Sequence, residues 1–388
     1  MDTNIFDVII IGAGVAGSSA AYEIATAGLK TIVLEKEKIP RYKTCGGGVI
    51  LRSASLLPFR IDSVVQKEFR IADVYDSENK IKFRIERTQP FIFMTMRSDL
   101  DLFLLSKAIE NGAKVNDQSE VKEIISNEDY VEVKTSNNTY YTRLVIACDG
   151  ATGFTMTKFK LNQNIIRVPA VESELFVDEA TFSRFKDVVR FDFGFVPHGY
   201  GWVFPKKDHL SIGVAFMKKV NQSIQEWFRR YLEFLKIESR DVLRNEKHGY
   251  IIPFISGKVK CSYRRILFSG DNLGFADPLT AEGISYAIET GQLAARTIIN
   301  NYPYYQKIIQ NYNSSLESVY KEIKSANLLS KVVYGPPALR KFIFRRWGNR
   351  LSELLTDVIA GEKKYRKLVY NPVNYFKLFK PAYWILEK

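Results

Sequence analysis

Residues 7–18 decide the fold of the first domain and read Asp7-Val8-Ile9-Ile10-Ile11-Gly12-Ala13-Gly14-Val15-Ala16-Gly17-Ser18. Residues 8–11 are apolar and predict a buried strand, the glycines predict a tight turn, and residues 16–27 predict a helix that Gly28 ends. A second apolar run, residues 31–34, predicts the next strand and is followed by Glu35. Strand, glycine turn, helix, second strand and acid together match the G-x-G-x-x-G fingerprint of a dinucleotide site.

Each glycine of this turn has its own physical reason. Gly12 permits the tight turn, Gly14 lets a pyrophosphate approach the backbone, and Gly17 lets the helix pack closely on the strand. The helix N-terminus offers free amide donors and a partial positive charge to the phosphates. Glu35 can accept hydrogen bonds from ribose hydroxyls. Taken alone, these residues fit NAD as well as FAD.

The composition narrows the class of partner. The chain has 388 residues, 46% of them hydrophobic, which suggests two or three domains. Its formal net charge of +13 indicates nucleic acid, anionic lipid, a phosphorylated substrate, or simply a lysine-rich solvated surface. No zinc finger, helix-turn-helix or RNA-binding signature is present. We therefore expect membrane or phosphate contact and no nucleic-acid partner.

Cysteine usage and hydropathy indicate a cytoplasmic protein. Cys45, Cys148 and Cys261 are far apart and form no C-x-x-C pair, which argues for a reducing compartment and against a structural metal. No apolar run is long enough to span a bilayer. Asp2 and Asp7 flank a short run without a basic segment, so we expect a first strand rather than a signal peptide. Peripheral contact with the inner face of the cell membrane stays open.

The pattern of predicted elements indicates a discontinuous first domain. We expect residues 1–70, 96–158 and 262–300 to form the dinucleotide-binding domain, because strand and helix patterns of that kind recur there. Residues 71–95 and 159–261 are aromatic and alternating, which predicts an inserted sheet-rich domain. Residues 301–388 read as helical, with a break at Gly335-Pro336-Pro337.

Several spaced motifs resemble the flavoprotein group typified by aromatic hydroxylases. These are the glycine turn with Glu35, Arg97 opening a helix, Asp149-Gly150 after a strand, and Gly270-Asp271 with Gly283-Ile284. The resemblance implies an α/β fold (α+β overall): a Rossmann-type FAD-binding domain, an inserted antiparallel-sheet substrate domain and a C-terminal helical region. It also implies that Asp271 faces the ribityl and pyrophosphate portion of FAD, and that the Gly283-Ile284 backbone lies by the flavin ring.

Two further motifs resemble the geranylgeranyl reductase family, which includes the archaeal digeranylgeranylglycerophospholipid reductases that saturate the isoprenoid chains of membrane lipids. One is Lys43-Thr44-Cys45-Gly46-Gly47-Gly48; the other is Tyr200-Gly201-Trp202-Val203-Phe204-Pro205-Lys206. With residues 278–284, the resemblance covers most of the chain up to about residue 295. The FAD contacts that it implies are Gly12, Gly14, Ala16, Gly17, Glu35, Cys45, Gly46, Gly48, Arg97, Val121, Asp271, Gly283 and Ile284.

The same motifs suggest a substrate site. At the period of a strand, Tyr200, Trp202 and Phe204 share one face. They either line an apolar slot for a polyprenyl chain or fill the core of the second domain. Cys45, in a loop whose three glycines allow close approach to a flat ligand, can shield the flavin or contact the substrate. We predict Cys45, Tyr200 and Trp202 as the catalytic residues.

The predicted reaction is reduction of isoprenoid double bonds by a hydride from N5 of the reduced flavin and a proton. The proton donor stays open between Cys45, Tyr200, a water and the flavin. The reductant is NAD(P)H or an electron-donor protein such as reduced ferredoxin. Two alternatives stay open: a flavin monooxygenase or halogenase on the same fold, and a prenyl-lipid escort protein without chemistry.

A basic segment near the C-terminus is the second reason to expect membrane contact. Arg340-Lys341, Arg345-Arg346 and Lys363-Lys364 alternate with apolar residues, as in a helix that lies at a lipid surface. The alternative is a solvated helix that packs its apolar face, with Phe342, Phe344, Trp347 and Leu351, on the body of the protein.

Overall fold

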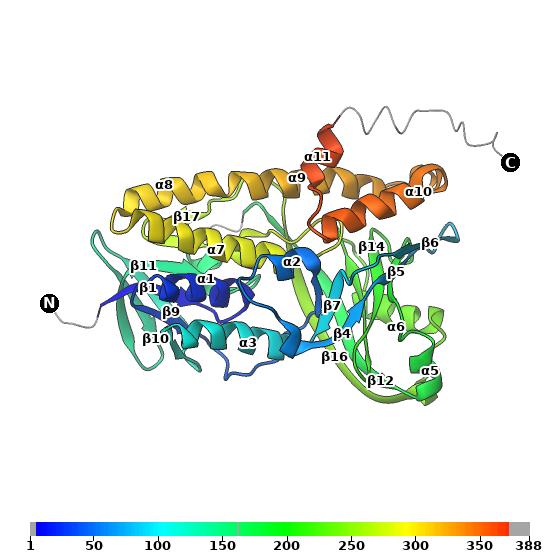
Figure 1. Ribbon diagram of the computed structural model, residues 1–388, viewed down its shortest axis with the longest axis horizontal. Coiled ribbons are helices and arrows are strands. Elements are labelled where there is room, and N and C mark those ends of the chain that lie inside the picture. The colour runs from blue at the N-terminus through cyan, green and yellow to red at the C-terminus, as the bar shows by residue number, and fades with distance from the viewer. Residues whose placement is uncertain (1–4, 161–162, 372–388) are drawn as a thin grey trace.

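The computed structural model describes residues 5–160 and 163–371 and contains a large sheet at each end of the molecule (Figure 1). The first sheet has eight strands. Its central strands pair in the order β18-β11-β1-β2-β8, all parallel. The bounds are β1 Phe6–Ile11, β2 Thr31–Leu34, β8 Lys114–Asn116, β9 Val121–Ser126, β10 Val131–Thr135, β11 Thr139–Ala147, β17 Ser262–Tyr263 and β18 Ile266–Phe268.

Three helices pack beside this sheet: α1 (Val15–Thr26), α3 (Arg97–Glu110) and α7 (Ile284–Asn301). Val8, Ile9 and Ile10 of β1 are fully buried, as expected for a parallel strand covered on both faces. Two glycines set the close packing of α1. A Cβ on Gly17 would lie 1.9 Å from the carbonyl oxygen of Gly12, and one on Gly291 would lie 2.3 Å from that of Ala16.

The second sheet has seven strands in the order β16-β12-β15-β14-β13-β5-β6, and only the β13–β5 pair is parallel. Strands β5 and β6 come from the first quarter of the chain and complete a sheet that is otherwise made much later in the sequence. The bounds are β5 Ile71–Asp76, β6 Ile81–Glu86, β12 Ile165–Val177, β13 Val189–Phe193, β14 Gly199–Pro205, β15 Leu210–Phe216 and β16 Val242–Ile255.

A third, three-stranded sheet, β3 (Gly48–Ile50), β7 (Ile92–Thr95) and β4 (Val65–Phe69), joins the two parts. Up to residue 371, where the described part of the chain ends, four helices follow α7: α8 (Tyr305–Ser315), α9 (Glu317–Val333), α10 (Pro337–Ile359) and α11 (Tyr365–Tyr370). Figure 1 shows α8 and α9 along one edge of the molecule and α10 returning over the second sheet. The predicted break at Gly335-Pro336-Pro337 separates α9 from α10. Residues 1–4, 161–162 and 372–388, which belong to the predicted domains, lie outside the described residues.

The predicted architecture is confirmed: a Rossmann-type α/β domain with a parallel central sheet, a second and mostly antiparallel sheet, and a C-terminal helical region. Among residues 5–160 and 163–371, no helix has the length and apolar character needed to cross a bilayer.

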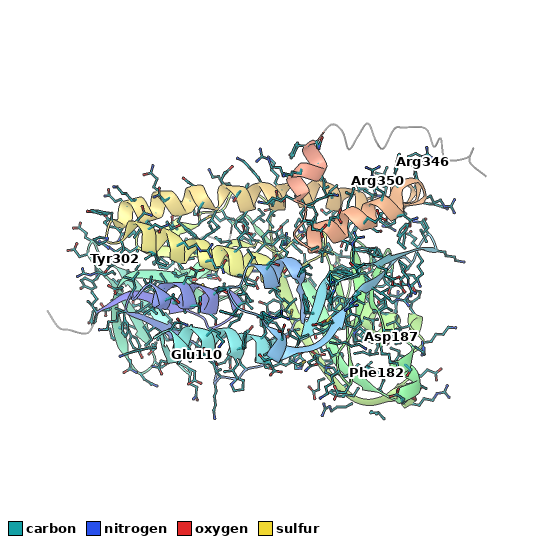
Figure 2. All side chains as sticks on the ribbon, in the orientation of Figure 1. Glu110, Phe182, Asp187, Tyr302, Arg346 and Arg350 are labelled. Atoms are coloured by element: carbon teal, nitrogen blue, oxygen red, sulfur yellow. The ribbon has the colours of Figure 1, made fainter. Side chains whose placement is uncertain are left out.

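Helix α10 corrects part of the expectation for the basic segment. Arg340 is buried, not at the surface; its Nε lies 3.1 Å from Oδ2 of Asp76, and its second amino group pairs with Glu78. Phe344 is also buried and packs edge-on against Phe83, with ring centroids 5.7 Å apart. The reason is amphipathicity: this face of α10 packs on the sheet. Arg346 points away from the body in Figure 2, so the basic character persists on the outer face.

Candidate active site

A cavity of about 850 Å³ extends from the glycine turn of the first sheet to the aromatic strand of the second. Its walls come from both large sheets and from the C-terminal helices. The sequence-predicted cofactor residues that line it are Gly12, Gly14, Ala16, Glu35, Cys45, Gly46, Gly48, Arg97, Val121, Asp271, Gly283 and Ile284. Gly17 does not line the cavity. Its lack of a side chain instead lets α1 pack closely against the turn.

The turn after β1 is shaped for an anionic ligand. Gly12 has φ +98°, and a Cβ there would lie 2.5 Å from the carbonyl oxygen of Cys148. Gly14 caps α1 without a side-chain hydrogen bond, and the first turn of α1 carries no acidic residue. The first amides of α1 are therefore not used by a side-chain cap. Helix N-termini of this kind bind phosphate groups.

Glu35 closes the turn from the second strand. Its side chain is almost completely buried, and Oε2 accepts a hydrogen bond of 2.8 Å from the backbone N–H of Ala13. Nε of Arg41 lies 3.5 Å from the same oxygen. The carboxylate is thus held at the end of β2, where the fingerprint places the acceptor for a ribose.

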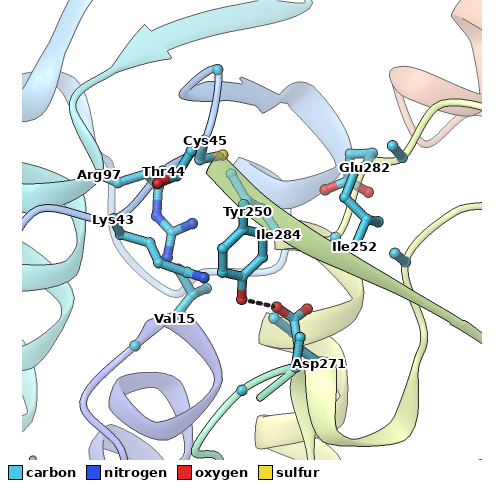
Figure 3. Close-up of a pocket in the computed structure, with 18 of the residues that line it drawn as sticks. Val15, Lys43, Thr44, Cys45, Arg97, Tyr250, Ile252, Asp271, Glu282 and Ile284 are labelled. Atoms are coloured by element: carbon cyan, nitrogen blue, oxygen red, sulfur yellow. Dashed lines mark hydrogen bonds between the residues drawn. The ribbon is translucent and has the colours of Figure 1, made fainter. Parts of the chain in front are cut away.

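Arginine side chains add positive charge to this half of the cavity. Arg97, at the start of α3, and Arg41 both contact the carboxylate of Asp101, at 2.9 and 3.3 Å. Figure 3 shows Arg97 beside Thr44 and Cys45, at the edge of the glycine loop, as we name residues 45–48. The shared carboxylate fixes both guanidinium groups without occupying all of their donors.

Sequence reasoning predicted Asp271 as a cofactor residue and included Lys43 in a motif, but it missed Tyr250, which contacts both of them. Nζ of Lys43 lies 3.2 Å from the ring centroid of Tyr250, and the Tyr250 hydroxyl donates a 3.1 Å hydrogen bond to Oδ2 of Asp271 (Figure 3). Burial lowers the pKa of Lys43 to about 8, although Asp271 acts in the opposite direction. Tyr250 lies on β16, and nothing in its local sequence signals that it reaches the glycine turn.

The glycine loop lies against the aromatic strand β14. A Cβ on Gly46 would lie 2.8 Å from Cδ2 of Phe204 and 3.1 Å from Nε1 of Trp202. Gly47 has φ +74° and packs against the carbonyl of Thr95, which a Cβ would approach to 2.0 Å. Only Gly47 needs a positive φ, so the three glycines serve different purposes.

Tyr200, Trp202 and Phe204 line the other half of the cavity from β14, and Tyr200 and Trp202 are almost completely buried. The indole of Trp202 lies over Gly213 of the neighbouring strand, where a Cβ would come within 2.1 Å of the ring. The Tyr200 hydroxyl donates a 2.8 Å hydrogen bond to the carbonyl of Thr280. The apolar wall is completed by Val74, Ile85, Phe191, Phe193, Leu355, Val358, Ile359 and Tyr365.

The residues present fit FAD. Around Gly14, the one atom within 4 Å of an added Cβ is the guanidinium nitrogen of Arg41, so the described residues leave the space above the turn open. The α1 amides, Glu35 and the cationic side chains match a pyrophosphate and a ribose. Among the described residues, the buried indole N–H of Trp202 has no hydrogen-bond partner, which leaves a donor available at the junction with the apolar half.

Comparisons with known proteins agree with this geometry. The sequence profile of the FAD binding domain family matches residues 5–187. The chain is 30% identical over 306 residues to digeranylgeranylglycerophospholipid reductase 2 of Methanothermobacter thermautotrophicus, covering 74% of this chain and 76% of that protein. It is 32% identical over 294 residues to an uncharacterized protein of Methanosarcina barkeri, covering 76% and 74%.

The fold also matches the crystal structure of a geranylgeranyl bacteriochlorophyll reductase-like protein from Thermoplasma acidophilum. The TM-score is 0.70 at 21% identity, and the match covers 91% of this chain and 99% of that one. The sequence relatives, the FAD-binding profile and the motifs around Cys45 and Trp202 all indicate the same protein family. The chain belongs to the geranylgeranyl reductase family of FAD-dependent oxidoreductases.

Proposed function

We propose that this protein saturates the double bonds of geranylgeranyl chains in archaeal-type membrane-lipid precursors. One observation carries the proposal: a single cavity joins the dinucleotide turn to a slot walled by aromatic and aliphatic side chains. A nucleotide cofactor and a long apolar chain can therefore meet inside the protein. The names of the archaeal relatives support the substrate class.

The cofactor half would hold FAD through residues from several segments. The α1 amides near Gly14 and Ala16 would bind the pyrophosphate, Glu35 the ribose, and Arg97 and Lys43 would balance the negative charge. Asp271 would face the ribityl portion. Val121, the backbone of Gly283 and Ile284, and the glycine loop at Cys45, Gly46 and Gly48 would complete the site. When bound and reduced, FAD supplies a transferable hydride at N5.

The apolar half would hold the prenyl chain and exclude water. An isolated alkene has no carbonyl to accept negative charge, so we infer that positive charge develops at its trisubstituted carbon. The ring faces of Tyr200 and Trp202, with Phe204, would stabilise that charge as aromatic faces stabilise cations. Tyr200 is a poor acid here because burial raises the pKa of its hydroxyl, which already donates to Thr280. Cys45 would lie at the junction of flavin and substrate.

The test is anaerobic turnover. Enzyme loaded with FAD and reduced with dithionite is incubated with geranylgeranyl diphosphate or a digeranylgeranyl glycerophospholipid, and mass spectrometry counts the hydrogens added. Saturated product supports the proposal and tells the two substrates apart. A product that forms only with oxygen would instead favour a monooxygenase or halogenase. A colourless protein without flavin absorbance would favour an escort protein. Repeating the assay with NADPH or reduced ferredoxin in place of dithionite identifies the electron donor.

Peripheral binding to the cytoplasmic face of the membrane is part of this proposal. Lys341, Phe342, Arg345 and Arg346 are exposed on α10 and combine basic and apolar character. Sedimentation with anionic liposomes at two salt concentrations tests it. Salt-sensitive binding that is lost when Arg345 and Arg346 are changed to Gln supports membrane contact; absence of binding to anionic vesicles refutes it.

A further inference from the structure

A pair of buried acids lies in the wall of the cavity, outside every motif discussed above. Glu172 and Glu174 lie two residues apart on β12 and are 1% and 2% exposed. Glu172 lines the cavity. In the sheet it is opposite Gly213, which is opposite Trp202. Because Gly213 has no side chain, the Trp202 ring can lie across it, and the acid and the indole are neighbours on the cavity wall.

Glu172 is tied to the glycine loop. Its Oε2 accepts a 2.8 Å hydrogen bond from the backbone N–H of Cys45, and its Oε1 accepts a 2.9 Å bond from the hydroxyl of Ser211. Because the two acids are two residues apart on one strand, their side chains lie on the same face of β12. Two neighbouring buried carboxylates repel each other, and a proton on one of them relieves that repulsion.

A series of close polar groups leads from this pair towards solvent, although within the described residues neither Oε2 of Glu174 nor Nε2 of His209 makes a hydrogen bond. Nε2 of His209 lies 3.1 Å from Oε2 of Glu174, and Nδ1 of His209 lies 2.7 Å from Oδ1 of Asp208. The side chain of Asp208 is 68% exposed, whereas that of His209 is 5% exposed. Titratable groups thus run from the protein surface to the cavity wall, each within contact of the next.

The charge balance places one proton on the acid pair. Two carboxylates face a single buried ammonium, that of Lys206, which lies 2.5 Å from Oε1 of Glu174. One added proton makes the group of Glu172, Glu174 and Lys206 neutral, and a neutral group costs less free energy to bury than a charged one. Burial first, and then the charge of Glu174, raise the pKa of Glu172 to about 7. Burial would also raise the pKa of Glu174, but His209 and Lys206 lower it below its usual value.

We propose that Glu172 donates the proton that saturates the alkene, and that Glu174 and His209 return a proton to it from solvent. This inference rests on the proposed function. One alkene carbon takes a hydride, with two electrons, from the reduced flavin; the other takes the proton as the O–H bond of Glu172 breaks. The flavin is oxidised and Glu172 is left as a carboxylate. Dithionite or the physiological electron donor then restores the reduced flavin.

The apolar half of the cavity would exclude water. Glu172 must therefore regain a proton from within the protein before the next double bond is reduced. The Glu172 carboxyl meets that need because it touches the cavity on one side and Glu174 on the other. The titratable and polar groups that face the pair from each neighbouring element are Tyr42 and Cys45 from the loop after β2, His248 and the exposed Glu246 from β16, Lys206 and His209 from the β14–β15 turn, and Ser211 from β15.

The experiment compares Glu172→Gln with Glu246→Gln. Glutamine keeps the acceptor for the Cys45 N–H, and Glu246 is an exposed carboxylate on the neighbouring strand β16. In single-turnover assays, Glu172→Gln should lower the rate of alkene saturation about 100-fold or more, the range of a lost general acid. The wild-type rate should fall as the pH rises through about 7, where Glu172 loses its proton. Glu246→Gln should retain both the rate and this pH dependence.

A second readout does not depend on turnover. Infrared difference spectra of the substrate-free protein should show a protonated carboxyl band that disappears as the pH rises through about 7. The band should be absent from Glu172→Gln and present in Glu246→Gln. His209→Gln should keep the first turnover and slow later ones, because the refilling path is interrupted.

The outcomes separate this inference from the proposed function. If the wild-type enzyme saturates no geranylgeranyl substrate, the proposed function fails. If the wild type is active and Glu172→Gln keeps its rate and pH dependence, Glu172 is not the donor. A carboxyl band that survives in Glu172→Gln also overturns the inference, even where the variant binds FAD poorly.

Discussion

The three glycines of the glycine loop should respond unequally to alanine. A Cβ on Gly46 would lie 2.8 Å from Phe204 and 3.1 Å from Trp202, so the loop and the rings must move apart. A Cβ on Gly48 would have its nearest neighbour at 3.6 Å, an ordinary contact. Overpacking of this kind costs about 1–3 kcal/mol. We therefore expect Gly46→Ala to lower the free energy of unfolding by about that amount, and Gly48→Ala to change it little.

The same displacement should weaken FAD binding. The glycine loop lines the proposed flavin site. Because Gly46→Ala displaces this loop from the rings of β14, the variant should lose a similar free energy in FAD binding. A change of about 1–3 kcal/mol raises the dissociation constant roughly 5- to 150-fold. Quenching of FAD fluorescence by the apoprotein measures that constant, and urea unfolding of the apoprotein measures stability. Gly48→Ala is the matched control for the stability measurement, because it adds the same methyl group to the same loop.

Gly47→Ala extends the series and should be the most damaging. Its φ of +74° disfavours a side chain, and the added Cβ would meet the Thr95 carbonyl oxygen at 2.0 Å. Strand pairing of β3 with β7 should suffer with it, because Thr95 donates its N–H to the Gly47 carbonyl. If Gly46→Ala and Gly48→Ala give the same free energy of unfolding, the contact between the loop and β14 is refuted.

Further expectations follow from buried charges. Arg340→Met should lower the free energy of unfolding, measured in urea, by about 3–5 kcal/mol, because it leaves the fully buried Asp76 without its ion-pair partner. Lys341→Met, at an exposed position on the same helix, should change this free energy little. Glu35→Gln should weaken FAD binding about tenfold or more in fluorescence titrations, since a ribose loses a charged acceptor; unchanged affinity would contradict the ribose role. Folded Lys43 loses its proton near pH 8 and unfolded lysine near 10.5, so between these values the unfolded state binds more protons. The stability of the apoprotein, measured by urea unfolding, should therefore rise with pH above about 8 relative to that of Lys43→Met. If the stabilities of the wild type and Lys43→Met change with pH in the same way, the Lys43 ammonium is not buried as the structure has it.

The dinucleotide unit could be predicted because each of its signals is local. The strand, the glycine turn and the helix follow one another within residues 7–28, and each residue type there has one dominant physical reason. The alternation of Tyr200, Trp202 and Phe204 likewise predicted a shared face, and the structure places all three on the cavity wall. The chemistry of FAD and of prenyl chains came from resemblance and not from these patterns.

What sequence reasoning missed depends on contacts between distant segments. Lys43 and Tyr250 lie far apart in the sequence, and their contact exists only because β16 passes the loop after β2. Glu172 reads as one more polar position in an alternating strand until the Cys45 backbone is seen to donate to it. The local sequence groups Arg340 with the surface cations of α10, because its partner Asp76 lies on a strand from the first quarter of the chain.

The order in which the ribosome makes the chain gives the C-terminal helices a particular importance. Leu355, Val358 and Ile359 of α10 and Tyr365 of α11 supply part of the apolar wall, yet they are synthesised after both sheets. Until they emerge, the aromatic strand β14 faces solvent along that side. A chain that stops before α10 should therefore be prone to aggregation and should recruit chaperones, even though its cofactor half is complete.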